Sequence, residues 1–189
     1  MYGETPYILL NFTGSETDIL TFAHELGHGI HHLLCSQQGY LNDATPISLA
    51  EVASEFAENI VFKKQISEAK NKSERLHLLV AYVSEQIKSI HAQIGYYNFE
   101  KRVHAERQKG SLTTERLNQI WAEEHERYTG EKLEGDNRYR WMRISHLFNS
   151  PFYVYCYAFA GVLVNNLIKV YEEDDLENLD LCDFPSRFM

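Results

Sequence analysis

The chain has 189 residues and a formal net charge of −9, with 44% hydrophobic and 24% charged residues. This length is enough for one domain with a sizeable core. The negative charge argues against a nucleic-acid-binding protein and against attachment to an anionic membrane surface, because both kinds of binding depend on Lys and Arg.

The first part of the chain predicts two helices. Residues 6–10 form a β-prone run after a proline, which predicts a short strand or an extended arm. Ser15 and Asp18 match a capping box, so a helix should begin near residue 16 and end at about residue 35. A polar, turn-like loop should then lead to a second helix over about residues 47–67.

The middle of the chain predicts two further helices. Ser73 is the expected cap of a third helix, which should continue with a bend near Gly95 to about residue 109. A fourth helix should span residues 114–128, and residues 130–136 read as a loop. Apolar residues on one face of the third helix recur at helical spacing: Leu76, Leu79, Val80, Val83 and Ile87.

The last part of the chain predicts a fifth helix and an acidic tail. Proline suits the first position of a helix, so Ser150-Pro151 predicts a helix that should reach about Tyr171. Residues 172–189 are dense in Asp and Glu and should be frayed. With few prolines, no repeat and no linker, residues 1–189 are expected to form a single all-α domain.

The cysteines and the hydropathy pattern indicate in which cellular compartment the protein is expected. Cys35, Cys156 and Cys182 are odd in number and contain no C-x-x-C pair, so no disulfide scaffold is expected. The first residues lack a signal peptide, and the most apolar window, residues 157–168, is too short to span a bilayer. We therefore expect a cytoplasmic protein.

Residues 24–28 read His-Glu-Leu-Gly-His, which is an H-E-x-x-H motif. Residues four apart lie on nearly the same face of a helix, so His24 and His28 can reach a single ion. We expect Glu25 to lie on the side where a water ligand would sit and to act as the general base. A catalytic zinc ion takes three protein ligands and keeps a position for water, so a third ligand is needed.

Glu51, on the next predicted helix, is the expected third ligand, because a His₂Glu set is a known catalytic zinc arrangement. Glu55 and Glu58 follow on roughly the same helix face. We expect Glu58, with Glu55 as the alternative, to orient a liganding histidine. A purely structural reading, in which the histidines lie on the surface of an amphipathic helix, is disfavoured by the apolar residues around them.

Three segments together resemble the oligoendopeptidase F branch of the thimet oligopeptidase family of zinc metallopeptidases. The first leads from residues 7–14 into the H-E-x-x-H helix, and the second is Glu-Val-Ala-Ser-Glu-Phe-Ala-Glu-Asn at residues 51–59. The third, residues 144–158, contains Pro-Phe-Tyr-Val-Tyr-Cys-Tyr-Ala after a histidine. The zinc motif is shared by many peptidases, whereas the third segment is far more specific to this branch.

The resemblance implies a largely helical peptidase with a deep, narrow cleft that admits short peptides and excludes folded proteins. It also implies one Zn²⁺ per chain, held by His24, His28 and Glu51, with Glu25 as the base. Members of this family are much longer than this chain, so we expect a fragment or a truncated product. Truncation would expose apolar surface, and self-association is therefore expected.

The resemblance further implies that His146 and tyrosines of the third segment bind the substrate and stabilise the tetrahedral intermediate. On a helix that starts at Pro151, Tyr153 and Tyr157 share a face while Tyr155 points largely away, so Tyr153 and Tyr157 are the expected residues. Without the resemblance, these tyrosines would be read as core aromatic residues.

The expected function is a zinc metallo-endopeptidase that hydrolyses internal bonds of short peptides. Three alternatives remain open: a catalytically incompetent zinc-binding fragment, a structural helical domain without a metal, and a zinc exopeptidase with the same ligands. Zinc is favoured by the ligand types, although cobalt or manganese can substitute in a His₂Glu site.

Overall fold

The computed structural model describes residues 5–42 and 44–173. Within these residues every regular element is a helix, so the all-α prediction is confirmed. The α-helices are α1 (Glu16–Ser36), α2 (Val52–Glu68), α3 (Lys72–Arg107), α4 (Thr114–Thr129), α5 (His146–Asn149) and α6 (Tyr155–Glu173). Short 3₁₀ helices connect them: η1 (Tyr40–Asn42), η2 (Ile47–Leu49) and η3 (Gly135–Arg143).

A capping box starts α1, as the sequence predicts. The Ser15 hydroxyl accepts the Asp18 N–H at 3.2 Å, and the Asp18 carboxylate accepts the Ser15 N–H at 3.0 Å. The Thr13 N–H and hydroxyl also donate to Asp18. Residues 5–13 are neither helix nor strand, so the N-terminal run is an arm and not a strand.

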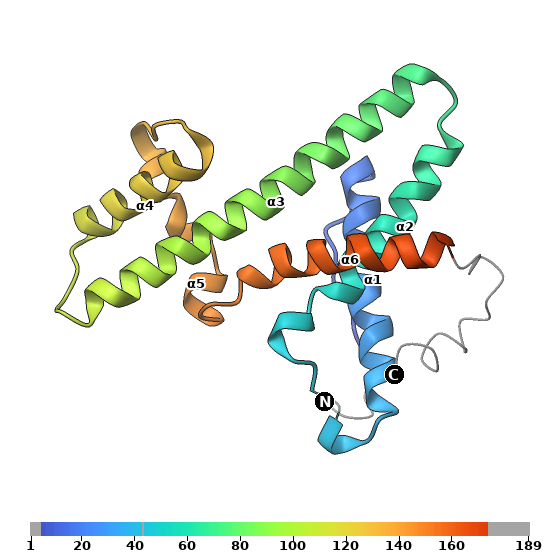
Figure 1. Ribbon diagram of the computed structural model, residues 1–189, viewed down its shortest axis with the longest axis horizontal. Helices are drawn as coiled ribbons and strands as arrows, with labels where there is room; N and C mark the ends of the chain where they lie inside the picture. Colours follow the sequence, from blue (N-terminus) through green and yellow to red (C-terminus); the bar gives the residue numbers. More distant parts are fainter. Residues whose placement is uncertain (1–4, 43, 174–189) are drawn as a thin grey trace.

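The helix α2 lies between α1 and α6 and packs against both (Figure 1). Gly27 permits the close approach of α1 to α2. A Cβ atom at this position would lie 2.6 Å from the carbonyl oxygen of Ala53 and 2.7 Å from the Cα of Ser54. Only glycine avoids this clash with backbone, and the contact brings the start of α2 beside the histidines of α1.

The long helix α3 joins two groups of helices, with α1, α2 and α6 on one side and α4 and η3 packed along its C-terminal half (Figure 1). Its cap is Asn71, which accepts the Glu74 N–H at 3.0 Å, so the expected cap at Ser73 is wrong by two residues. The helix continues through Gly95, where the Tyr128 ring of α4 occupies the space of a side chain. Phe99, Ile120 and Trp121 form the buried cluster between α3 and α4.

The predicted helix start at Ser150-Pro151 is wrong. The chain forms the short helix α5, then a turn, and α6 begins only at Tyr155. Phe152 has a φ of 60°, which is outside the helical region, so no helix can run through it. The helix α6 reaches Glu173, and the remainder of the predicted acidic tail, with Cys182, lies outside the described residues.

The apolar face predicted on the first half of α3 exists, but its side chains are exposed, and many large apolar side chains of α1 are exposed as well. In the part of the chain that the structure describes, no helix is long and apolar enough to cross a membrane.

Candidate metal centre

Two histidines of α1 and one carboxylate at the start of α2 converge on one point. His24 and His28 are one turn apart, and their ring centroids are 4.8 Å apart. The Nε2 atoms of both rings lie 3.2 Å from Oε2 of Glu51. One ligand atom from each residue lies within 4.8 Å of the others, so these three side chains can hold a metal ion.

Glu51 is buried, with 2% of its surface exposed, and both of its carboxylate oxygens have partners. The hydroxyl of Ser54, one turn further along, donates to Oε2 at 3.1 Å. The hydroxyl of Tyr153 donates to Oε1. Burial alone would raise the pKa of Glu51, but the hydrogen bonds from His24, His28 and Tyr153 hold the pKa well below its usual range. Glu51 is therefore an ionised carboxylate that directs Oε2 toward both histidines.

The second ring nitrogen of His24 contacts Glu58. Its Nδ1 lies 2.5 Å from Oε1 of Glu58. This leaves Nε2 of His24 to face Glu51 in the set of His24, His28 and Glu51, which we call the metal group. Burial lowers the pKa of His24, but hydrogen bonds with Glu51 and Glu58 outweigh it and raise the pKa to about 10. A histidine must be neutral to bind a metal, so binding would displace this proton.

Glu55, the alternative to Glu58 in the sequence prediction, makes no hydrogen bond to a histidine in the described residues. It lies against α6, where a Cβ atom at Gly161 would be 3.3 Å from its Oε2. Burial raises its pKa to about 8, and the negative charges of Glu58 and Glu51 add to the effect. The structure thus places Glu58, and not Glu55, on a histidine of the metal group.

His146, Tyr153 and Tyr157 form an aromatic cluster beside Glu51. The rings of His146 and Tyr153 stack with centroids 5.4 Å apart, and the hydroxyl of Tyr157 lies 3.3 Å from Nε2 of His146. Burial, with Glu51 nearby, raises the pKa of both tyrosines, so they are neutral donors. Tyr153 precedes α6, so the two tyrosines meet through the turn and not by sharing a helix face. Tyr155 packs instead against Tyr97 of α3.

Glu25, the expected general base, is half-buried on α1 beside His24. Its carboxylate makes no hydrogen bond and no ion pair with the described residues, in contrast to Glu51 and Glu58. The carboxylate of Glu25 is therefore not engaged by the protein groups around it.

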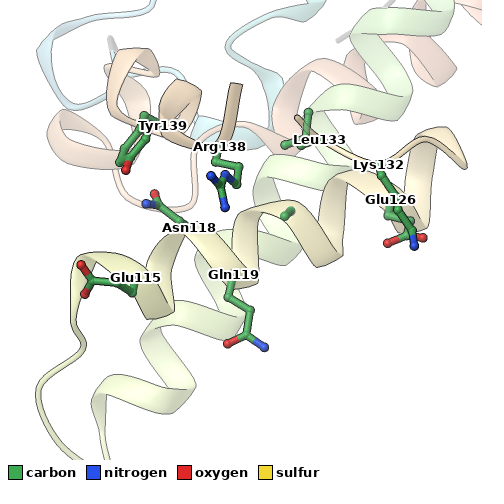
Figure 2. A pocket seen from close by; sticks show the side chains of 9 residues that line it. Glu115, Asn118, Gln119, Glu126, Lys132, Leu133, Arg138 and Tyr139 are labelled. Atoms are coloured by element: carbon green, nitrogen blue, oxygen red, sulfur yellow. The ribbon is translucent and has the colours of Figure 1, made fainter. Parts of the chain in front are cut away.

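Two pockets differ in their relation to this group. A pocket of about 380 Å³ adjoins it, with His24, Glu55, Glu58 and Tyr157 in its lining. A pocket of about 500 Å³ lies elsewhere, between α4 and the segment that follows it (Figure 2). The side chains in Figure 2 include Asn118 and Gln119 of α4 and none of the metal group, so this second pocket has no link to the site.

Ser54 was not predicted from the sequence as a partner of Glu51. Its position three residues after a predicted ligand is a signal that could have identified it. Glu100, a buried residue of α3, was not predicted either, because no local pattern indicates its contact with the turn before α6.

The family model described as Peptidase family M3 matches residues 2–181. The chain is 33% identical over 161 residues to the chromosomal oligoendopeptidase F of Lactococcus lactis subsp. cremoris, covering 83% of this chain and 27% of that protein. It is 32% identical to group B oligopeptidase PepB of Streptococcus agalactiae, over 89% of this chain and 28% of that protein. It is 29% identical to oligopeptidase PepF of Bacillus subtilis, over 83% of this chain and 24% of that protein. The chain thus spans about a quarter of the length of these relatives, and no solved structure matches it.

Proposed function

The chain belongs to the oligoendopeptidase F branch of peptidase family M3, and we propose that it is the zinc-binding catalytic part of an endopeptidase that cleaves short peptides. The observation that carries the proposal is the convergence of His24, His28 and Glu51 within 4.8 Å. The chain spans about a quarter of the length of the relatives it matches, so the activity of the whole relatives comes to this chain only as a proposal.

The donor set supports zinc as the metal. Two imidazole nitrogens and one carboxylate oxygen are a catalytic zinc ligand set, with bonds of roughly 2.0–2.2 Å. Ligand atoms at the corners of a tetrahedron with such bonds lie about 3.3–3.6 Å apart. The Nε2 atoms of both histidines lie 3.2 Å from Oε2 of Glu51, close to that spacing. The contact of His24 with Glu58 supports the role of Glu58 as the residue that orients this ligand.

Zinc held here would lower the pKa of a bound water toward 7 and polarise the scissile carbonyl group. Glu25 would accept the proton of that water and pass it to the leaving amine. Its carboxylate makes no hydrogen bond or ion pair with the described residues, which supports this role because it leaves the oxygens available to a water.

The aromatic cluster would bind the oxyanion that develops on the substrate. His146 and Tyr157 are in hydrogen-bond contact and lie next to Tyr153, so their donors come from one small region beside Glu51. Such donors are most effective when they are held in place before the reaction. The Tyr153 hydroxyl already donates to Glu51, which supports a second role for Tyr153 in holding the ligand.

The substrate class follows from the relatives, which are named oligopeptidases and oligoendopeptidases. The pocket beside His24 is lined by the carboxyl groups of Glu55 and Glu58, which supports binding of peptide groups that donate hydrogen bonds. A cytoplasmic location and a single domain over residues 1–189 remain predictions.

The test is cleavage of a fluorogenic peptide blocked at both ends, before and after chelation and with zinc added back. Zinc-dependent cleavage between internal residues supports the endopeptidase. An enzyme that needs a free terminus would leave this peptide intact and cut an unblocked one. Stoichiometric zinc without cleavage of either peptide would contradict catalysis and favour a non-catalytic zinc-binding fragment.

A further inference from the structure

Among the described residues, Glu100 is a buried carboxylate with no cationic group closer than 4.0 Å. It lies in α3 with 3% of its surface exposed. Its Oε1 accepts the backbone N–H of Phe152 at 2.9 Å, and Nε2 of the exposed His104 is 4.0 Å away. Its Oε2 has no hydrogen-bond partner among the described residues. Burial of a carboxylate with one unpartnered oxygen costs free energy. The hydrogen bond that Glu100 accepts from the Phe152 N–H therefore needs an explanation.

That contact holds an unusual backbone conformation. Phe152 has a φ of 60° and is the one non-glycine residue with a positive φ in the described part of the chain. A bulky residue adopts this conformation only where its surroundings impose it. The hydrogen bond from the Phe152 N–H to Glu100 is one such restraint.

The side chain of Phe152 is restrained from the same helix. Tyr97, Glu100 and His104 lie three and four residues apart on α3, so they share one face. The Phe152 ring packs against Tyr97, with centroids 6.0 Å apart, and against His104, with centroids 4.9 Å apart. One face of α3 therefore contacts both the backbone and the ring of Phe152.

The residue after Phe152 is Tyr153, whose hydroxyl donates to Glu51 and whose ring stacks on His146. The turn is closed by the Tyr153 N–H, which donates to the Ser150 carbonyl at 3.1 Å. Because a change of φ at Phe152 rotates everything that follows, the direction of the Tyr153 side chain depends on the conformation that Glu100 holds.

We propose that Glu100 is a positioning residue that acts through the Phe152 N–H to direct the Tyr153 hydroxyl at Glu51. The inference deepens the proposed function, because Glu51 is the carboxylate ligand of the proposed zinc site. A buried residue of α3 thus controls a contact of Glu51, which stands directly before α2. Among the described residues, Glu100 makes no hydrogen bond or ion pair with His24, His28 or Glu51.

The direct test follows Tyr153 by ¹⁹F NMR in protein labelled with 3-fluorotyrosine. The Tyr153 signal is the one lost in Tyr153→Phe. We expect Glu100→Ala to move this signal toward that of an exposed fluorotyrosine, whereas Glu100→Gln, which keeps an oxygen acceptor, leaves it near its wild-type position. Lys101→Ala, at the exposed neighbouring position of the same helix, is the matched control. An unchanged Tyr153 signal in a folded Glu100→Ala protein would overturn the proposal.

A second measurement needs no substitution. The Phe152 amide of the wild-type protein should exchange its hydrogen at least about 100-fold more slowly than in an unstructured peptide, because it is bonded to a buried carboxylate. Exchange at the unprotected rate would overturn the proposal even if Glu100→Ala failed to fold.

Zinc affinity separates a positioning role from a merely structural one. Loss of a group that orients a ligand weakens metal binding by about 10-fold or more. We expect this loss in both Glu100→Ala and Tyr153→Phe, and no further loss in the double variant, because both act through one contact. If the losses of zinc affinity in the two single variants add up in the double variant, Glu100 does not act through Tyr153 and the proposal is contradicted. If the wild-type chain binds no zinc at all, the proposed function fails, and the two NMR measurements still decide the positioning role.

Discussion

Three buried carboxylates of the described residues, Glu51, Glu100 and Glu124, differ in what offsets the cost of their burial. Glu124 accepts hydrogen bonds from Arg102 and Arg127, both at 3.1 Å, so it is paired with cationic groups of α3 and α4. Glu51 faces two histidines and a tyrosine. A carboxylate whose partners are imidazoles rather than Arg or Lys is suited to a metal, because the same nitrogens become ligands when they lose their protons.

The substitution Glu25→Gln tests whether Glu25 is the general base. The substitution preserves shape and leaves the three proposed ligands untouched, so zinc content should not change. Turnover of a blocked peptide should fall by about 10²–10⁴-fold, because proton transfer from the water is lost. Turnover and zinc content would be measured on the same preparation. A variant that retains its zinc and turns over at the wild-type rate would refute the assignment.

Glu55 carries a pH prediction for the metal-free protein. Its pKa is raised from 4.5 to about 8 in the folded state, mainly by burial. Between these two values the folded state binds more protons than the unfolded state, so stability should fall as pH rises through that window. Glu55→Gln should remove this loss, and the variant should be more stable than wild type at pH 9 with chelator present. Urea unfolding at pH 5 and pH 9 measures the difference, and an equal pH dependence in both proteins would contradict the raised pKa.

Some helix boundaries can be predicted from local sequence signals and others cannot. The start of α1 follows from its capping box, and α4 begins at Thr114 as predicted. Glu51 was expected within the second helix but stands directly before α2, where it meets His24 and His28. The start of α6 at Tyr155 was not predicted, although Ser150-Pro151 is a strong local signal for a helix start. Phe152 is held in a left-handed conformation by α3, some fifty positions earlier in the chain, and this contact overrides the local preference. Tyr153 therefore reaches Glu51 from a turn, which helical spacing could not predict.

Gly27 and Gly29 give a matched test of how α1 and α2 come together. A Cβ atom at Gly27 meets the backbone of Ala53 and Ser54 at 2.6–2.7 Å, whereas one at Gly29 meets only side-chain atoms at 3.7–3.8 Å. Gly27→Ala should destabilise the fold by about 1–3 kcal/mol through overpacking and should weaken zinc binding. Gly29→Ala should do neither. Chemical unfolding and zinc titration of both variants check this, and equal behaviour of the two would contradict the close approach at Gly27.

The described residues expose many large apolar side chains along α1 and the first half of α3. Leu76, Val80, Val83 and Ile87 lie on one face of α3, and each is at least half exposed. Exposed apolar patches of this kind mark interaction surfaces. The fold of the described residues brings the metal group together without burying this face.

We therefore expect the purified chain to self-associate through this face in a concentration-dependent manner. The double variant Val80→Glu and Val83→Glu should lower the average mass in sedimentation and leave the helix content unchanged. The control Ala81→Glu adds one negative charge to the same helix, against two in the double variant. It lies outside the apolar face, so it should leave the average mass unchanged. A wild-type chain that remains monomeric at all concentrations, or an equal effect of Ala81→Glu, would contradict the prediction.

We expect His24, His28 and Glu51 to hold one zinc ion, and elemental analysis of the purified chain measures this. Wild type and the control Glu68→Ala, an exposed position of the same α2 helix, should each carry about one zinc per chain after dialysis. Glu51→Ala, with its helix content verified, should carry almost none. A wild-type chain that binds no zinc even when zinc is added, or a Glu51→Ala chain that retains it in full, would contradict the account.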